Sequence, residues 1–252
     1  MFARERQQKI LELLKDKNSI KVSQVCELLN VSESTIRRDL QEMEANNLLE
    51  RTHGGAVTVE KTSFEPSFEE KKQEKNLEKS NIGKAAADLI KDNDTVILDC
   101  GTTILEIAKN IKAKNITVIT NSIDIATELL NKKGIELIVT GGNLRLHTRA
   151  MVGPITEKIL RNFRVDKVFL GANGISIKEG VTTPNFIEAQ TKRTMIEVSK
   201  KIIVVSDSSK FDKVSLSVVC NLKDIDKIIT TNDIDENIIK DYINAGVEMI
   251  TV

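Results

Sequence analysis

The order of hydrophobic and polar positions divides the chain into an amino-terminal helical part and a longer part of alternating strands and helices. Ile10, Leu13 and Leu14 form one apolar stripe at helical spacing, and a second, shorter stripe contains Val22, Val25, Leu28 and Leu29. From residue 81 onward, short β-branched runs alternate with amphipathic segments: "TVILD", "ITVIT", "IELIV", "VDKVFL", "KIIVVS", "DKIIT" and "VEMITV". This alternation predicts a parallel or mixed sheet covered by helices.

A tight turn and a third helix follow the two amino-terminal stripes. In "VSESTIRRDL", residues 31–40, Ser32 is placed as the helix N-cap. Ile36, Leu40 and Met43 fall at i, i+4 and i+7, so they should face inward. A short helix, a turn and a second helix with an outward polar and basic face are typical of a helix-turn-helix DNA-binding unit.

The outward face of that third helix suits a nucleic acid. Arginine can fork onto guanine or phosphate, and hydroxyls near a helix start can donate to phosphate. After the helix, "THGG" allows a tight hairpin turn, which predicts a wing. The predicted partner is double-stranded operator DNA, and the candidate contacts are Ser32, Ser34, Thr35, Arg37, Arg38, Gln41 and His53.

A solvated arginine-rich helix face is the alternative interpretation. Residues 1–57 carry nine Lys/Arg and nine Asp/Glu, so strong non-specific DNA binding is not implied. The DNA-binding interpretation therefore rests on the helix-turn-helix and wing signals.

Composition narrows the classes of protein. The 252 residues include 37 basic and 37 acidic side chains and are 40% hydrophobic, which suffices for a sizeable core. No apolar run approaches the roughly 18 residues of a membrane span, and the amino terminus is charged rather than signal-like. Three isolated cysteines and only two histidines, His53 and His147, predict a cytoplasmic protein without a metal or cofactor site.

Charge patterning suggests the domain boundaries. Residues 59–80 are almost all polar or charged and predict a linker that becomes helical after Pro66. The expected organisation is a DNA-binding domain over residues 1–58, a linker over 59–80 and an α/β domain over 81–252.

Polar turns follow three successive predicted strands of the α/β domain. Asp99 ends one strand, and Gly101, Thr102 and Thr103 begin the next helix, where amide N–H groups favour an anion. A helix cap explains this turn alone equally well. Two further turns contain Thr120, Asn121 and Ser122, and then Gly141 with Gly142. Because ligands bind beyond the carboxyl ends of the strands in such sheets, three such turns predict a crevice.

Charged residues later in the chain are candidates for the same crevice. Glu188 and Lys192 are spaced i, i+4, which also fits an ordinary surface pair. "SDSSKF" places Asp207 and Lys210 at another strand end. Lys210 is the first candidate for a phosphate cation, followed by Arg145, Arg149 and Lys192. For each, a solvated surface charge is the alternative.

The chain resembles the DeoR family of bacterial transcription regulators. "RERQQKILELL" and "STIRRDL…RTHGGAV" are similar to the family's amino-terminal signature, and "ILDCGTT", "VITNS", "VTGGNLR", "FLGANGIS" and "SDSSKF" are similar, in order, to its sensor domain. The resemblance implies a winged helix-turn-helix repressor whose α/β sensor domain has the fold of ribose-phosphate isomerases and binds a phosphorylated sugar or similar metabolite. It also implies site roles for Gly171, Glu188 and Lys192.

The sequence departs from the family at two positions. Position 100 is Cys where members often carry Ser or Ala, and "IITT" continues with Asn where an acidic residue is usual. The second departure leaves any acidic role there open.

Two functions are consistent with these features. One is a repressor released from its operator by a phosphorylated sugar, and the other is a sugar-phosphate isomerase with an appended DNA-binding module. Glu188 or Asp99 would supply the base of the isomerase. The repressor is favoured because the amino-terminal module has no purpose in an isomerase. A homodimer or homotetramer is expected, since one small module seldom reaches regulatory specificity alone. The identity of the effector and the operator sequence are left open, as is the sign of regulation.

Overall fold

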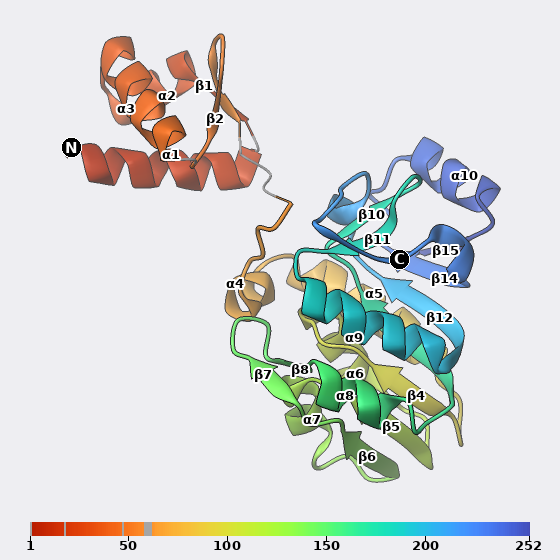
Figure 1. Ribbon diagram of the computed structural model, residues 1–252. Helices are drawn as coiled ribbons and strands as arrows, with labels where there is room; N and C mark the ends of the chain where they lie inside the picture. The colour runs from red at the N-terminus through yellow and green to blue at the C-terminus, as the bar shows by residue number, and fades with distance from the viewer. Residues whose placement is uncertain (1, 18, 47, 58–61) are drawn as a thin grey trace. The chain divides into compact units, whose positions relative to one another are not determined.

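The computed structural model describes residues 2–17, 19–46, 48–57 and 62–252. The chain forms two compact units, Met1–Lys61 and Thr62–Val252 (Figure 1). Within the described residues, no helix has both the length and the apolar character needed to cross a membrane.

The first unit contains three helices and a small antiparallel sheet. The helices are α1 (Ala3–Lys17), α2 (Val22–Leu29) and α3 (Glu33–Ala45), and the strands are β1 (Ser19–Lys21), β2 (Glu50–Thr52) and β3 (Gly55–Val57). The strands are ordered β1-β3-β2, so β2 and β3 form the predicted hairpin. This is a winged helix-turn-helix fold.

The inward face of α3 is confirmed. Ile36, Leu40 and Met43 are fully buried in the core of this unit, together with Ile10 and Leu14 of α1. The helical spacing of these residues determines that face, because side chains at i, i+4 and i+7 lie on one side of a helix.

The expected stripe on α2 is wrong at one position. Leu28 is 64% exposed, whereas Val22, Val25 and Leu29 are buried. Leu28 precedes Leu29 by one residue, and therefore lies about 100° away from it around the helix.

The second unit is built on a seven-stranded parallel sheet in the order β15-β14-β12-β9-β4-β5-β6. All seven predicted apolar runs are strands of this sheet, which confirms the predicted α/β class. The strands are β4 (Thr95–Leu98), β5 (Ile116–Thr120), β6 (Ile135–Val139), β9 (Val165–Gly171), β12 (Ser199–Val205), β14 (Lys227–Thr230) and β15 (Glu248–Thr251).

Helices cover both faces of the parallel sheet (Figure 1). One buried cluster joins the sheet to α4, α5, α6 and α7, and a second joins it to α8, α9 and α10. Their bounds are α4 (Phe68–Gln73), α5 (Asn76–Ala87), α6 (Thr102–Asn110), α7 (Ile123–Leu129), α8 (Pro154–Leu160), α9 (Phe186–Glu197) and α10 (Glu236–Asn244).

Smaller antiparallel elements flank the main sheet. A second sheet has the order β10-β11-β13, and β7 pairs with β8 in a hairpin. The bounds are β7 (Asn143–Arg145), β8 (Ala150–Val152), β10 (Gly174–Ser176), β11 (Gly180–Thr183) and β13 (Ser217–Cys220), with short 3-10 helices at Ser208–Lys210 and Leu222–Asp224.

The segment expected to be a linker differs from that expectation. The second unit begins at Thr62 rather than at residue 81, and residues 62–80 pack on it. Ser67 caps α4 through a capping box with Glu70, which directs Phe68 into the core. The charged composition of this segment reflects its exposed positions and obscures the one buried aromatic ring. Residues 58–61 of the expected linker lie outside the described residues.

Candidate functional site

The polar face of α3 is the candidate DNA-binding surface of the first unit. Ser32 caps the helix and accepts a hydrogen bond from the Thr35 amide at 3.3 Å, as predicted. The side chain of Arg37 is 50% exposed and pairs with Glu33 at 3.2 Å. The remaining predicted contacts on this helix are also exposed: Ser34, Arg38 and Gln41.

A buried ion pair fixes the orientation of α3. The Arg6 guanidinium donates two hydrogen bonds to Asp39, from Nε to Oδ2 at 2.6 Å and from Nη2 to Oδ1 at 3.0 Å. Such a bidentate pair has a fixed geometry, so it holds α1 and α3 in one orientation. Sequence reasoning missed it, because an acid that follows two exposed arginines gives no sign of burial.

His53 lies in the turn of the wing and is exposed, between β2 and β3. Gly55 enters the wing against β1, where a Cβ would lie 1.8 Å from the carbonyl oxygen of Ile20. The glycine is therefore required by the close approach of these two backbones. The wing and the polar face of α3 therefore belong to the same small unit.

Substituting either arginine of α3 tests this surface. We expect Arg37→Ala or Arg38→Ala to weaken operator binding by about 5- to 150-fold, the effect of losing one base or phosphate contact of about 1–3 kcal/mol. Thermal stability should change little, because both side chains are exposed. Operator titration at one fixed salt concentration measures the effect, with Arg164→Ala in the second unit as a control. Unchanged operator affinity in both variants would remove α3 from the interface.

The second unit contains a cavity at the carboxyl ends of β4, β9 and β12. Its floor is the start of α6 at Gly101, Thr102 and Thr103, the turn that follows β9, and the segment from Ser206 to Lys210. Two residues of α9, Glu188 and Lys192, also line it, as do residues between Glu65 and Lys79. Of the three turns on which the predicted crevice rested, only the one at Gly101 lines this cavity. The cavity is enclosed partly by the segment that was expected to be a linker.

A buried ion pair lies at the base of the cavity. The Lys192 ammonium of α9 donates to Asp99 Oδ2 and to the carbonyl oxygen of Gly171, the latter at 3.1 Å. Burial by itself would lower the pKa of Lys192, but the charge and hydrogen bond of Asp99 outweigh it and hold that pKa above its ordinary value. The two side chains are engaged with each other. Asp99 therefore anchors α9 to the sheet, and it does not line the cavity.

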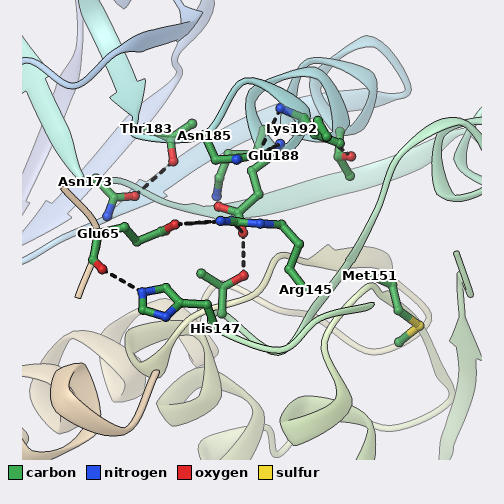
Figure 2. A network of polar contacts seen from close by, with 12 residues as sticks. Glu65, Arg145, His147, Met151, Asn173, Thr183, Asn185, Glu188 and Lys192 are labelled. Carbon is green, nitrogen blue, oxygen red and sulfur yellow. Dashed lines mark hydrogen bonds and ion pairs between the residues drawn. The ribbon is translucent and has the colours of Figure 1, made fainter. Parts of the chain in front are cut away.

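A second charged network lies at the cavity wall. The Glu188 carboxylate accepts from the Arg145 guanidinium and from the Thr148 hydroxyl. Figure 2 shows the guanidinium of Arg145 between the carboxylates of Glu188 and Glu65. Burial by itself would lower the pKa of Arg145, but the two carboxylates raise it overall. The alternative interpretation of Glu188 and Lys192 as an ordinary i, i+4 surface pair does not hold, because both side chains are buried and each has separate partners.

Lysine side chains gather at the side of the cavity near Asp207. Lys75 pairs with Asp207 at 2.8 Å, and Lys79 donates to the carbonyl oxygen of Glu74 at 2.7 Å. In the described part of the chain, Lys210 has no carboxylate partner within ion-pair distance. Burial lowers the pKa of Lys210, although the charge of Asp207 opposes this shift. An anion bound beside this desolvated ammonium would stabilise its charge, so Lys210 is a candidate anion-binding group.

Besides Asp99, four predicted effector contacts do not line this cavity. Thr120 donates to the Leu98 carbonyl at 2.7 Å, Asn121 donates to the Met151 carbonyl at 3.0 Å, and Ser122 caps α7. The carbonyl oxygen of Gly141 accepts from Thr156 at 2.6 Å. These residues bond to neighbouring parts of the fold outside the cavity, and their strands β5 and β6 lie beyond β4, on the side away from β12.

Arg149 also lies away from the cavity lining. It pairs with Asp124 at 2.8 Å, and its guanidinium lies 5.0 Å from the ring centre of Phe68. It holds α4 against α7 and is not a cavity cation.

Several lining residues were missed by sequence reasoning. They come from the segment interpreted as a linker and from two loops: Glu65, Phe68, Lys71, Lys75, Lys79, Thr148 and Asn173. The one available signal was "SFEPSF", in which two phenylalanines flank a proline within a charged stretch.

A winged helix-turn-helix unit joined to an α/β domain with a charged cavity defines a DNA-binding transcriptional regulator. The chain belongs to the DeoR family: the DeoR-like helix-turn-helix domain matches residues 6–62, and the DeoR C-terminal sensor domain matches residues 74–232.

Relatives cover nearly the whole chain. The putative aga operon transcriptional repressor of Escherichia coli O157:H7 is 39% identical over 251 residues, covering 98% of this chain and 93% of the relative. The uncharacterised regulator YulB of Bacillus subtilis strain 168 is 37% identical over 252 residues, covering 100% and 98%. The repressor GlcR of the same strain is 39% identical over 230 residues, covering 91% and 89%.

Solved structures give weaker similarities. Ribose 5-phosphate isomerase A of Methanocaldococcus jannaschii matches with a TM-score of 0.38 and 16% identity, covering 53% of each chain. A probable sor operon regulator of Shigella flexneri matches with a TM-score of 0.38 and 9% identity, covering 54% of this chain and 77% of the other. At this level of similarity neither match bears on function.

Proposed function

We propose that this protein is a repressor of a carbohydrate-metabolism operon, released from its operator by a phosphorylated sugar that binds in the cavity of the second unit. The observation that carries the proposal is Lys210, a cavity lysine without an ion-pair partner among the described residues, which shares the cavity with the start of α6. The names of two relatives, the aga operon repressor and GlcR, support the role of repressor.

The cavity is suited to a phosphate at one end. Lys210 and the buried Lys79 supply positive charge at this end. Burial lowers the pKa of both lysines, and the nearby charge of Lys71 lowers it further. The first amides of α6 add the positive end of a helix dipole at Gly101 and Thr102. A doubly charged group would relieve the repulsion among these lysines.

The other end of the cavity is suited to hydroxyl groups. Glu188 offers a carboxylate there and Asn173 an amide (Figure 2). Thr148, which is bonded to Glu188, offers a hydroxyl. These side chains can exchange hydrogen bonds with a polyhydroxylated ligand. A phosphate position and a hydroxyl-binding position in one cavity are the chemistry of a sugar phosphate.

Lys210→Ala tests the phosphate position. We expect this variant to bind fructose 1-phosphate, or whichever sugar phosphate stabilises the wild type in a thermal-shift screen, about 10- to 150-fold more weakly, the effect of losing a charged hydrogen bond of about 1.5–3 kcal/mol. Operator binding without ligand should be retained. Titration calorimetry measures the affinity, with the exposed Lys178→Ala as the control. Normal sugar-phosphate affinity in Lys210→Ala would assign the phosphate elsewhere.

The assembly is also part of the proposal. A homodimer or homotetramer would place two helix-turn-helix units on half-sites about one helical turn of DNA apart. The isomerase with an appended DNA-binding module is not favoured, because the relatives are transcriptional regulators. Steady turnover of pentose or hexose phosphates, abolished by Glu188→Gln, would reverse that preference.

A further inference from the structure

Residues 62–70, which we name the strap, run along the cavity directly after the end of the first unit. The strap is hydrogen bonded at both ends: the carbonyl oxygen of Thr62 accepts from the Leu216 amide at 2.9 Å, and the Phe68 amide donates to the His147 carbonyl at 2.9 Å. Between them, the carbonyl oxygen of Glu65 lies 2.6 Å from the His147 ring (Figure 2). The strap therefore connects the β10-β11-β13 sheet with the β7–β8 hairpin.

The side chain of Glu65 is the strap's contribution to the cavity. Its carboxylate is 6% exposed and lines the cavity. Oε2 accepts from both terminal nitrogens of Arg145 at 3.2 Å, and Oε1 lies 3.5 Å from the Lys71 ammonium. The protein thus supplies a carboxylate of its own to Lys71, which lines the cavity, and to Arg145, which lies behind that lining.

Lys71 connects this carboxylate to the lysine cluster. It pairs with Glu65 on one side, and on the other side its charge lowers the pKa of both Lys79 and Lys210, after the larger effect of burial. An anion bound at Lys79 and Lys210 would attract Lys71 and repel the Glu65 carboxylate. The bound anion and Glu65 therefore compete for Lys71.

Of the two carboxylates at Arg145, Glu65 is the one that can move. Glu188 is held on the twelve-residue helix α9, where Asn185 caps its amide at 3.0 Å, and its carboxylate accepts from Thr148. Glu65 lies on irregular backbone, and its carbonyl oxygen contacts the His147 ring. Displacing its carboxylate breaks the contacts to Arg145 and Lys71 but no helical backbone bond, whereas Glu188 is fixed at the capped start of a helix.

We propose that Glu65 is an internal competitor of the anionic ligand, and that its displacement releases the strap and so lowers operator affinity. This inference rests on the proposed function and names how that cavity is coupled to DNA. The strap attached through Glu65 is the operator-binding form, and an anion in the lysine cluster favours the released form. A ligand shifts such an equilibrium only through its different affinity for the two forms, and the coupling is reciprocal.

Glu65→Gln tests the proposal in the full chain, with Glu69→Gln as the matched control. Glu69 is on the same strap, and its exposed carboxylate pairs with Arg149 instead of facing the cavity. Relative to wild type, Glu65→Gln should bind inorganic phosphate at least about fivefold more tightly, the lower end of ordinary coupling between sites. Hydrogen exchange at the Phe68 amide should be at least about fivefold faster without ligand. Operator affinity without ligand should fall at least about fivefold. The control should match wild type in all three measurements.

The outcomes separate this inference from the proposed function. If sugar phosphates release wild-type protein from its operator but Glu65→Gln behaves as wild type, the strap mechanism is wrong and the function stands. If no sugar phosphate changes wild-type operator affinity, the proposed function is wrong. Faster exchange and tighter phosphate binding in Glu65→Gln would then still support competition by Glu65, while unchanged values would contradict it.

Discussion

Lys192→Met is expected to lower the free energy of unfolding of the second unit by about 3–5 kcal/mol, because it leaves the Asp99 carboxylate buried without a counter-ion. The Asp99 and Lys192 side chains are 1% and 5% exposed, so water cannot replace the lost ammonium. Asp99 would keep one hydrogen bond, from the Gly171 amide at 3.1 Å. Its Oδ1 already has no partner among the described residues.

Urea unfolding of the full chain, followed by far-ultraviolet circular dichroism, measures this change. Lys201→Met is the matched control, since Lys201 is 61% exposed and water screens its ion pair with Asp226. The double variant Asp99→Asn, Lys192→Met removes both charges and should recover much of the loss. A loss below about 1 kcal/mol in Lys192→Met would show that this ion pair does not hold α9 to the sheet.

The pH dependence of this contribution follows from the raised pKa of Lys192. Lys192 binds its proton more tightly in the folded chain than in the unfolded chain, so the stabilisation is fully present below the ordinary lysine pKa. It is lost as pH rises through the higher pKa of the folded state. The difference between wild type and Lys192→Met should therefore be constant near neutral pH and decrease only in strongly alkaline solution.

Leu40→Ala is expected to cost about 2–5 kcal/mol of stability in the first unit, the range for truncating a fully buried leucine. Leu40 packs in the core beside Ile36 and Met43, so the variant leaves a cavity beneath the candidate DNA-binding face. Operator affinity should fall with stability, in contrast to the arginine variants, because α3 loses its support.

Native-state hydrogen exchange of the α3 amides in the full chain measures this effect without assuming that both units unfold together. Gln41→Ala is the control, because Gln41 is the next residue and is exposed. Exchange protection that is unchanged in Leu40→Ala would contradict the assignment of the inward face.

Features that depend on near neighbours along the chain can be predicted without the structure. Seven β-branched runs bounded by turns predicted the seven parallel strands, and the i, i+4, i+7 spacing on α3 predicted its buried face. Ser32 was predicted as the cap because an N-cap hydroxyl bonds within its own first turn. In each case the feature depends on residues only a few positions apart in the sequence.

Which polar residues share the cavity depends on how distant segments of the chain fold together. Asp99 and Lys192 are 93 residues apart, and Glu65 and Arg145 are 80 residues apart, so no local pattern connects them. The turn from Thr120 to Ser122 resembles the turn at Gly101, but its strand lies on the far side of β4 from β12. Strand order places one turn in the cavity and gives the other a structural role. The strap was missed for the same reason, since a charged segment becomes a cavity wall only through partners distant in the sequence.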